Sequence, residues 1–404
     1  MRYRPHQLVP LGEVATIDMG HSPPGSTYNE EGIGLPLLNG PTEFGDRSPS
    51  PTTWTTSPTR KAVSGDVLFC VRGSTTGRMN RADQEYCIGR GIAAIRGDTA
   101  YDTEFLHAAL RANLDRLLML TTGSTFPNLS RKDLETFNIP WPEGNQRHRI
   151  AHIAMSLDDK VENNRRLAKA LEEIAAALFK ARFLDFIGYD DLTESDIGPI
   201  APGWRTVALS EAVEINPPVR AIKKGLVVPH IGMADVPAWG VRPSRIESRE
   251  YAGGARFEPG DTLMARITGC IEHGKGAFID FLARPGAGST EFLVLRARSP
   301  LTPEMVFLLC RTARVRGHAI ANMSGSSGRQ RVQTSSFDHI KIAVPPNAEA
   351  VEREASILRA TFSQTHALWR ENNTVTLIRD VLLPRLISGK MFIPPDAAPR
   401  LENA

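Results

Sequence analysis

Long apolar runs and paired cysteines are both missing from this sequence, and each absence excludes a class of protein. No apolar run approaches the roughly 18 residues of a membrane-spanning helix, and the start MRYRPHQLVPLGE lacks a signal-peptide core. The cysteines at positions 70, 87, 270 and 310 form neither a CxxC pair nor a dense framework, which predicts buried free thiols in a reducing compartment. We therefore expect a soluble, cytoplasmic protein that does not bind membranes.

A strong excess of charge of either sign is also lacking. The 404 residues carry 48 lysines and arginines against 45 aspartates and glutamates, a formal net charge of +3. A polyanion must then be met by locally clustered cations rather than by overall attraction. The composition thus permits a nucleic-acid partner without demanding one, and the length predicts two or three domains.

A long helix is the clearest element that the sequence predicts. Residues 146–183 contain no proline or glycine, and side chains recur every seven residues at Ile150, Leu157, Asn164, Leu171 and Leu178. An adjoining row consists of Ile153, Val161, Leu167 and Ile174. The pattern indicates a coiled-coil helix roughly 57 Å long. Such a rod needs a partner helix, which we expect at 348–386 with the apolar stripe Ile357, Phe362, Leu368, Val375, Ile378 and Leu382.

Asn164 is the one polar residue on the heptad row of the first long helix. A polar residue on a seam usually fixes register and orientation at some cost in stability. Alternatively, the helix is slightly rotated and Asn164 touches solvent. The sequence leaves both readings open because it shows no partner residue.

A long-period repeat relates the two halves of the chain. Leu11, Glu13 and Ile17 recur as Leu209, Glu211 and Ile215, and Gly65-Asp66 recurs as Gly260-Asp261. Further pairs are Glu104 and Arg111 with Glu304 and Arg311, Gly123-Ser124 with Gly325-Ser326, and Leu134, Phe137, Ile139 and Pro142 with Phe337, Ile340, Ile342 and Pro345. Each copy mixes short β-like runs with one helical stretch and is followed by a long helix. The sequence predicts an internally duplicated α+β protein with pseudo-two-fold character.

The repeat and the long helices together define the expected domains. We expect the first α+β domain at 1–142, the first long helix at 143–185, a linker at 186–202 and the second α+β domain at 203–346. The second long helix follows at 347–390, and a tail occupies 391–404.

Several stretches, individually loose, occur here in an order and spacing typical of one family. They are LGEVATIDMGHSPPGS, SGDVLFCVRGS, TTGSTFPNLSRKDLETFNIPWP and TLIRDVLLPRLISGKMF. Across essentially its entire length the chain resembles the specificity (S) subunit of type I restriction-modification systems. It departs from the family pattern at the start of the first long helix, where Gly144 and Asn145 separate Glu143 from Gln146, and in the start PPNAEAVERE of the second.

The resemblance implies a non-catalytic DNA-recognition subunit. In this family two target-recognition domains each read one half of a bipartite double-stranded DNA site, and two antiparallel spacer helices set their separation. Two methylase (M) subunits dock on the spacers and nuclease-translocase (R) subunits can join, so S-adenosylmethionine and ATP are expected on the partners and no cofactor on this chain. Half-site centres are then expected about one helical turn apart, roughly 34 to 36 Å.

Apparent catalytic motifs in the sequence are incomplete. Asn216-Pro217-Pro218-Val219 lacks the aromatic fourth residue that stacks a flipped base in amino-methyltransferases. GCIEHGK at 269–275 is followed by Gly276 where a P-loop needs Ser or Thr, and a strand is expected next. No histidine spacing indicates a metal site. We read the run Asp158-Asp159-Lys160 as surface charge on the long helix.

Clustered cations are the better functional signal. From Met305 to Arg331 there are five arginines and no acidic residue, which suits phosphate contact, and Gln330 could bond an adenine edge. The candidate DNA-binding residues are Arg60, Lys61, Arg72, Arg78, Arg81, Thr125 and Asn128 in the first half and Arg266, Lys275, Arg329, Gln330 and Arg331 in the second. Any one of them could instead be a solvated surface residue.

Three other functions compete with DNA recognition within a complex. A stand-alone DNA-binding regulator would bind DNA without a partner, but the sequence shows no helix-turn-helix signature. A methyltransferase would bind S-adenosylmethionine directly, and the broken cofactor motifs oppose it. A coiled-coil scaffold would bind only protein.

Overall fold

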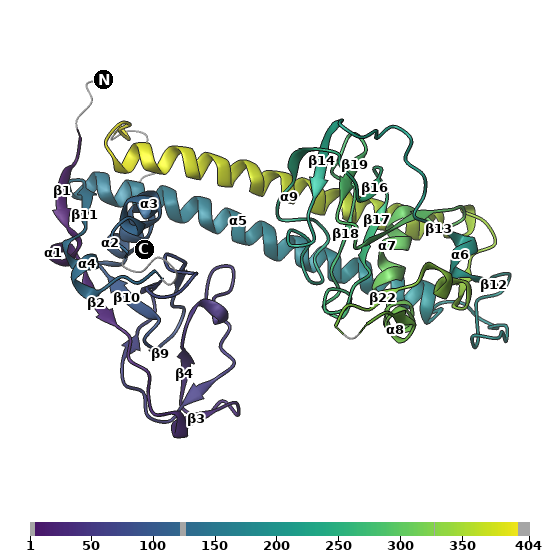
Figure 1. The fold of residues 1–404 in the computed structure, drawn as a ribbon, viewed down its shortest axis with the longest axis horizontal. Helices are drawn as coiled ribbons and strands as arrows, with labels where there is room; N and C mark the ends of the chain where they lie inside the picture. Colours follow the sequence, from purple (N-terminus) through teal and green to yellow (C-terminus); the bar gives the residue numbers. More distant parts are fainter. Residues whose placement is uncertain (1–4, 122–126, 327, 395–404) are drawn as a thin grey trace. The chain divides into compact units, whose positions relative to one another are not determined.

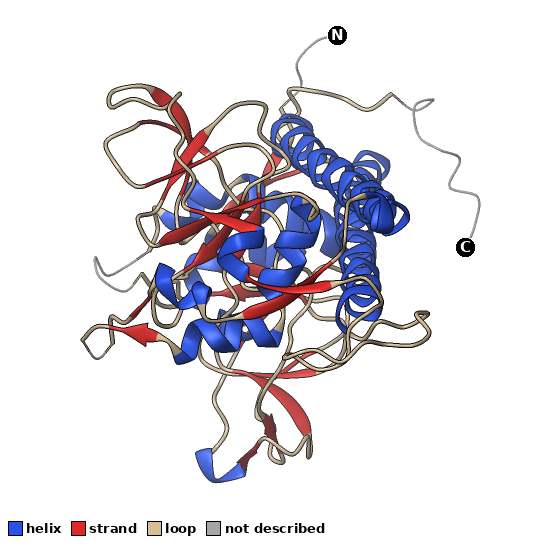
Figure 2. Cartoon of the chain, turned by 90° about the vertical axis from the view of Figure 1, so that its right-hand side faces the viewer, coloured by secondary structure: helices blue, strands red, loops and turns tan. Residues whose placement is uncertain are grey.

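The computed structural model describes residues 5–121, 127–326 and 328–394. The chain divides into two compact units, unit 1 (residues 1–164 and 371–404) and unit 2 (residues 165–370). Each unit contains one α+β domain together with part of both long helices. The strands are short and are joined by long loops (Figure 2).

The domain of unit 1 is built on a four-stranded antiparallel sheet ordered β2-β10-β7-β8. A mixed five-stranded sheet, β3-β5-β4-β9-β6, and the pair β1-β11 complete it. The strands are β1 Gln7–Pro10, β2 Thr16–Met19, β3 Tyr28–Asn29, β4 Leu35–Leu38, β5 Trp54–Thr55, β6 Lys61–Ala62, β7 Val67–Cys70, β8 Met79–Arg81, β9 Tyr86–Ile88, β10 Ile92–Arg96 and β11 Asn138–Trp141. The helices are α1 Leu11–Val14, α2 Ala100–Ala112, α3 Leu114–Leu118 and α4 Arg131–Thr136.

Unit 2 repeats this plan, with a four-stranded sheet β13-β20-β17-β18, a mixed sheet β15-β14-β19-β16 and the pair β12-β23. Its strands are β12 Arg205–Ala208, β13 Val213–Ile215, β14 Val227–Ile231, β15 Glu247–Glu250, β16 Ala255–Phe257, β17 Thr262–Ala265, β18 Gly276–Phe278, β19 Gly286–Gly288, β20 Phe292–Ala297, β21 Met323–Ser324, β22 Arg331–Val332 and β23 Lys341–Val344. The helices are α6 Leu209–Ala212, α7 Pro303–Arg311 and α8 Ala313–Ala321.

The predicted internal repeat is confirmed, although the mixed sheet has five strands in unit 1 and four in unit 2. In both units an equivalent arginine–aspartate ion pair holds the Gly-Asp turn that precedes β7 or β17. Arg96 binds Asp66 bidentately at 2.5 and 2.7 Å, and Arg296 binds Asp261 at 2.7 and 2.8 Å. Both aspartates are buried, so each needs its arginine to compensate for lost hydration. The duplication therefore extends to the polar contacts inside each domain.

Two pairs of the predicted alignment are wrong. The helix that follows β10 or β20 begins at a threonine N-cap, Thr99 for α2 and Thr302 for α7, and this places Glu104 opposite Phe307 rather than Glu304. Arg111 likewise falls opposite Arg314 rather than Arg311. Three more residues precede the cap in unit 2, between Arg296 and Thr302, than between Arg96 and Thr99 in unit 1. The sequence match at Glu304 thus reflects similar composition, not equivalent position.

Both long helices are present where expected (Figure 1). Helix α5 spans Gly144–Phe179 and continues into a π-helical turn at Lys180–Leu184, and α9 spans Glu352–Ile387. Within unit 1 the two run antiparallel, because Asp158 contacts Arg379 at 2.9 Å whereas Asn164 contacts Asn372 at 3.0 Å. No described helix is long and apolar enough to cross a lipid bilayer.

The heptad row of the first helix is confirmed as a buried seam, but the adjoining row is partly wrong. Ile150 and Asn164 are buried, and Leu157, Leu171 and Leu178 are half-buried. The second row instead consists of Ala154, Val161 and Ala175, whereas Leu167 and Ile174 are 47% and 58% exposed. On α9, Phe362 and Leu368 are buried, Val375 and Leu382 are half-buried, and Ile357 and Ile378 are exposed.

Asn164 lies on the seam, 4% exposed, and the alternative of a solvated side chain is excluded. Its Nδ2 donates to Glu371 Oε2 at 2.7 Å and to Asn372 Oδ1 at 3.0 Å, and Asn372 Nδ2 donates to the Val161 carbonyl at 3.2 Å. Polar seam residues with matched partners disfavour slipped pairings, which would leave them unbonded. Asn164 therefore specifies the register of α5 against α9 in unit 1.

Candidate nucleic-acid interface

Two segments distant in sequence meet at one end of the unit 1 sheet. Residues 71–78, after β7, contact residues 127–129, and we call this the first junction. Arg72 Nε donates to Asn128 Oδ1 at 3.0 Å, and Leu129 N donates to the Val71 carbonyl at 3.0 Å. Gly73 N donates to the Pro127 carbonyl at 3.0 Å. Two predicted DNA-binding residues, Arg72 and Asn128, are thus brought together across 56 positions of sequence.

The corresponding place in unit 2 is the second junction, formed by residues 266–275 and 330–332. Thr268 donates to the Gln330 carbonyl from its amide at 3.0 Å and from its hydroxyl at 3.1 Å. Val332 N donates to the Arg266 carbonyl at 2.8 Å, as Leu129 N does to Val71. Arg266 therefore occupies the position of Val71, one residue before the position of Arg72.

The two junctions also share a cation at the start of the next strand. Cys70 N donates to the Arg78 carbonyl at 2.8 Å, and Ala265 N donates to the Lys275 carbonyl at 3.0 Å, so Arg78 and Lys275 are equivalent. The preceding residues, Gly77 and Gly274, both have positive φ, 94° and 65°, which closes the turn without strain only for glycine. These glycine turns therefore fix the backbone position of each cation at the end of the sheet.

The predicted DNA-binding residues differ in how freely they can reach a ligand. Arg60, Arg72, Arg78, Arg329 and Gln330 are exposed. Lys61 is exposed but pairs with Glu85 at 3.3 Å, and Lys275 Nζ donates to the Met233 carbonyl at 3.0 Å. Arg331 binds Glu291 bidentately and lowers the pKa of that carboxyl. Thr125 lies outside the described residues.

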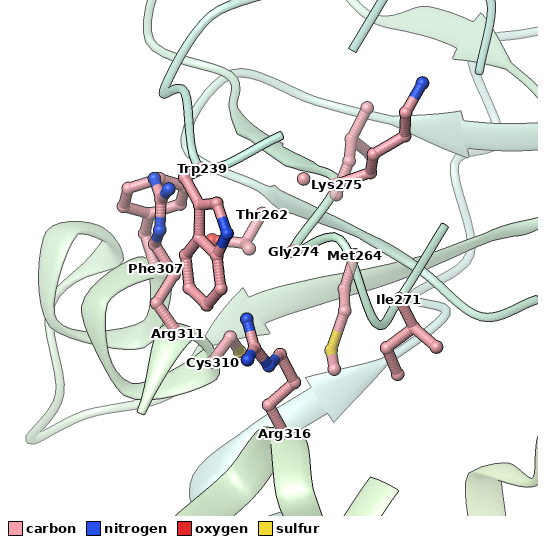
Figure 3. Close-up of a pocket in the computed structure, with 12 residues that line it drawn as sticks. Trp239, Thr262, Met264, Ile271, Gly274, Lys275, Phe307, Cys310, Arg311 and Arg316 are labelled. Atoms are coloured by element: carbon pink, nitrogen blue, oxygen red, sulfur yellow. The ribbon is translucent and has the colours of Figure 1, made fainter. Parts of the chain in front are cut away.

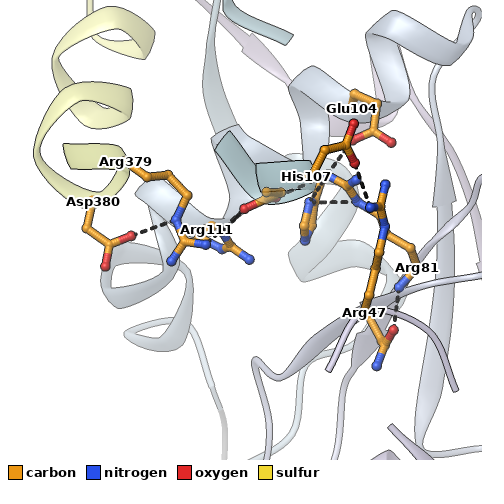
Figure 4. A network of polar contacts seen from close by, with 10 residues as sticks. Arg47, Arg81, Glu104, His107, Arg111, Arg379 and Asp380 are labelled. Carbon is orange, nitrogen blue, oxygen red and sulfur yellow. Dashed lines mark hydrogen bonds and ion pairs between the residues drawn. The ribbon is translucent and has the colours of Figure 1, made fainter. Parts of the chain in front are cut away.

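Arg81, on β8, is placed differently. It lies in a partly buried ionic network that joins β8 and α2 to the long helices α5 and α9 (Figure 4). Its guanidinium lies 2.5 Å from Glu104 and 3.3 Å from Asp158, and its side chain is 11% exposed. Nη2 also lies 3.1 Å from His107 Nδ1. These contacts occupy the guanidinium and argue against Arg81 as a phosphate contact, so we leave it out of the candidate interface.

Asp158 is the hub of this network, which corrects its interpretation as surface charge. Arg111, Arg379 and Arg81 approach it at 3.5, 2.9 and 3.3 Å. Burial alone would raise the pKa of Asp158, but the three guanidiniums hold it below its usual range. Burial also raises the pKa of Glu104 and, with Arg81, lowers that of His107 well below its usual range.

In unit 2 aromatic rings occupy the positions of Arg81 and Glu104, and a third ring packs against both. Phe278 is the β18 residue equivalent to Arg81, since β8 and β18 pair with β7 and β17 in the same register. Phe307 replaces Glu104, and the rings of Phe278 and Phe307 lie 5.7 Å apart. Phe362 on α9 contacts both, at 5.3 and 5.7 Å. At these equivalent positions the domain–helix contact is thus ionic in unit 1 and aromatic in unit 2, where the nearby Arg242–Asp280 pair adds hydrogen bonds from Arg242 to Thr365 and the Phe362 carbonyl of α9.

A cation-aromatic cavity beside the second junction was not predicted from the sequence (Figure 3). The Arg316 guanidinium lies 3.9 Å from the Trp239 ring centroid, and that of Arg311 lies 5.7 Å away. Trp239 has a φ of 60° and is 48% exposed. The cavity, about 30 Å³, has room for roughly two waters. In the sequence, the only indication of this cavity is the arginine run 311–316, because Trp239 lies about 75 positions away in the chain.

Exposed apolar side chains form a stripe on the long helices in each unit. The first stripe is Leu377, Ile378 and Val381 on α9, between 46% and 65% exposed. The second stripe is Leu167 and Ile174, seven residues apart on α5 and 47% and 58% exposed, and Ile357 on α9 is 42% exposed. Scattered apolar residues on a surface are ordinary, but groups of them often mark contact sites.

The motifs that suggested catalysis are structural. GCIEHGK is a loop that leads into strand β18, not a helix, and Asn216 follows the end of β13 with a φ of 52°. Among the described residues, no cluster of three or more His, Cys, Asp or Glu side chains could hold a metal ion.

Comparison with known proteins gives separate matches for the first half of the chain and for most of its length. Residues 4–173 match the family model of the type I restriction modification DNA specificity domain. A provisionally named type I restriction enzyme specificity subunit of Methanocaldococcus jannaschii, MjaX, is 35% identical over 41% of this chain and 40% of its own length. The first half of the chain is therefore similar to the DNA specificity domain of type I restriction-modification systems.

Two further relatives extend the match to the second half. The MjaIX specificity subunit of the same organism is 22% identical over 68% of this chain and 65% of its own length. The crystal structure of a type I restriction-modification S subunit from M. genitalium is similar over 94% of this chain and 96% of that chain, with a TM-score of 0.57 and 15% identity, which shows a shared fold. The chain spans less than two thirds of the length of both M. jannaschii relatives.

Proposed function

We propose that the chain is the DNA sequence-specificity subunit of a type I restriction-modification complex. Each α+β domain reads one half of a bipartite double-stranded DNA site, and the chain itself carries no catalytic centre. Base edges contacted by side chains such as Gln330 give specificity, and exposed arginines add salt-dependent phosphate affinity.

One observation carries this proposal: the same loop junction occurs once in each repeated domain and presents different side chains in the two copies. Arg72 and Asn128 stand in unit 1 where Ile267 and Arg331 stand in unit 2. A shared scaffold with different contact residues suits the reading of two different half-sites. The arginine–aspartate ion pairs at the opposite ends of β7 and β17 are the same in both units and keep the scaffold itself constant.

We propose that the exposed stripes on the helices dock two methylase subunits, one on each unit. A repeated patch suits two copies of one partner, because the duplication presents apolar side chains of the helix pair twice. Nuclease-translocase subunits would join through the methylases. S-adenosylmethionine and ATP would then be bound by those partners.

The test is to co-express the chain with its neighbouring methylase and to map methylated adenines across the genome at single-base resolution. We expect a split motif with a fixed gap that disappears when this chain is omitted. Co-purification without any split motif would contradict DNA recognition by the chain. Failure of the two proteins to associate would contradict docking on the stripes and favour a stand-alone regulator.

A further inference from the structure

The domain of unit 2 contains an open cleft beside the second junction. The cleft has a volume of about 330 Å³, large enough for a phosphate group and part of its sugar. It lies between the start of β20, the loop after β13 and strand β16. Its lining residues are Asn216, Pro217, Gly254, Ala255, Arg256, Arg266, Thr290, Phe292 and Val294.

The cleft has the electrostatic character of an anion site. Two arginines, Arg256 and Arg266, line it, and none of the described lining residues is acidic. Asn216 and Thr290, both exposed, add an amide and a hydroxyl. Guanidinium groups with neighbouring neutral polar groups are the usual contacts of phosphate oxygens.

Arg266 is incompletely bonded. Its Nη2 donates to the Val332 carbonyl at 2.9 Å, which fixes the guanidinium against the junction. Its Nε is buried and has no hydrogen-bond partner among the described residues. A buried unpaired donor is costly, and a shift of the guanidinium toward the cleft, which Arg266 lines, would let an anionic oxygen satisfy it.

A basic loop borders the same cleft. Arg256 Nη1 donates to the carbonyls of Val219 and Ile222 at 3.0 and 3.4 Å, and so attaches the loop after β13 to strand β16. This loop carries three exposed cations, Arg220, Lys223 and Lys224, and residues 216–224 include no acidic residue. The positive charge therefore extends from the cleft onto the adjoining surface.

A carboxylate next to the cleft in sequence is neutralised. Glu291 follows the lining residue Thr290, but Arg331 binds both of its oxygens at 2.7 and 2.8 Å. In unit 1 the equivalent backbone positions hold Val71 and Gly91, because Val71 N donates to Gly91 O as Arg266 N does to Glu291 O. The charged arrangement is thus particular to the second domain.

We propose that this cleft binds one backbone phosphate of the DNA and that Arg266 is its principal contact. The proposal rests on the proposed function, since it assumes that the second domain contacts DNA. It adds a positioning contact that would fix the second junction on one phosphate while Gln330 and its neighbours face the bases.

The experiment is a double-mutant cycle between the protein and the DNA backbone. The complex of the full chain with its methylase is titrated with target duplexes in which single phosphates are replaced by uncharged methylphosphonates. Wild type is compared with Arg266→Gln. We expect one position in one half-site where methylphosphonate weakens wild-type binding about tenfold but leaves the Arg266→Gln complex unaffected, since the contact is already lost.

Salt dependence gives a second readout. Loss of one phosphate contact should lower the slope of log K against log salt by about 0.9. Arg256→Gln should show the same coupled position, whereas Arg205→Gln, an exposed arginine on the separate β12-β23 pair, should show none. Arg266→Lys keeps the charge but lacks Nε, and we expect it to restore part of the affinity.

Three outcomes would overturn the proposal. If the penalties of Arg266→Gln and methylphosphonate multiply at every position, the cleft does not hold a DNA phosphate. If inorganic phosphate at matched ionic strength stabilises wild type but not Arg266→Gln, without any coupled position, the cleft is a free-anion site. If Arg266→Gln lowers the melting temperature or releases the methylase, its role is structural. Failure of the proposed function is distinct, because wild type would then bind no split site.

Discussion

Two adjacent carboxylates on α5 show that the surroundings of a residue determine whether its charge is packed against the protein or exposed to solvent. Asp158 is contacted by three guanidiniums at the contact between the unit 1 domain and the helices, whereas Asp159 forms a half-exposed pair with Arg47 at 2.6 Å. The sequence alone predicts that both residues are surface charges. The difference arises because one helical position, about 100°, separates the packed face from the solvated edge.

This contrast predicts unequal effects of matched substitutions. Asp158→Ala leaves three buried or half-buried arginines without their shared anion and should lower the free energy of unfolding by about 3 to 5 kcal/mol. Asp159→Ala removes an exposed pair and should cost at most about 1 kcal/mol. Urea unfolding of the full chain measures both. Equal effects would show that the network contributes no more than a surface ion pair.

Glu172 on α5 in unit 2 predicts a pH dependence of stability. Burial raises its pKa from the ordinary 4.5 to about 7, although Arg311 and Arg242 pull it down. The folded chain therefore holds a proton that the unfolded chain releases, and stability falls as the pH rises from about 4.5 to about 7. The loss is at most about 3 kcal/mol.

Removing the titrating group should remove that loss. Relative to wild type, Glu172→Gln should gain stability as the pH rises through this window, and the gain should be largest above pH 7. Urea unfolding at pH 5 and pH 8 measures it. Glu173→Gln changes an exposed neighbour whose charge is a minor cause of the raised pKa of Glu172, and its effect should differ much less between the two values. A Glu172→Gln effect that is the same at pH 5 and pH 8 would contradict the raised pKa.

Among the elements, the long helices were the most predictable and the small sheets the least. Helix α5 begins at Gly144, one residue from the expected start, because a seven-residue apolar period over 36 residues has no competing interpretation. Strands β3, β5 and β6 are two residues long, too short for any alternation to be read. Their pairing depends on distant partners and could not be predicted.

The errors on the helices have a common physical cause. Leucine and isoleucine at 167 and 174 were expected on the seam because they are large and apolar, yet alanines at 154 and 175 are buried instead. Close packing of the helices and domains favours small side chains on the inner row and leaves the large ones outside. The candidate site shows the same limit, since Arg72 and Asn128 were both predicted but their contact and the burial of Arg81 depend on tertiary structure.

The pairing of α5 with α9 predicts a specific role for Asn164. Asn164→Ala loses the bonds to Glu371 and Asn372 within a buried seam and should lower the free energy of unfolding by about 1 to 3 kcal/mol. Asn163→Ala, at an exposed neighbouring position, should change it by less than about 0.5 kcal/mol. Thermal and urea unfolding compare the two. A neutral Asn164→Ala would mean that the register is set by the apolar residues alone.

At the scale of the whole molecule, duplication separates what is constant from what varies. The Gly-Asp turns, their arginine partners and the sheet order are shared by the two units. The junction residues and the domain–helix contacts differ, being ionic around Asp158 and aromatic around Phe362. The proposed reading of two different half-sites suits this division, because a common framework can hold unrelated contact residues.

That division predicts that contacts in the two units act independently. Arg72→Ala in unit 1 and Arg329→Ala in unit 2 each remove one exposed guanidinium, and each should weaken DNA binding by the complex about tenfold while lowering the salt slope by about 0.9. The two residues share no contact, so the double variant should lose the product of the single effects. Methylase docking should not change, because neither residue lies on the helix stripes.

Arg131→Ala, which removes an exposed arginine of α4 paired with Glu135 at 2.7 Å, is the control. Unchanged affinity for both single variants would refute the junctions as the DNA-binding surface, and a double variant no weaker than either single one would show that the two units act on one shared contact.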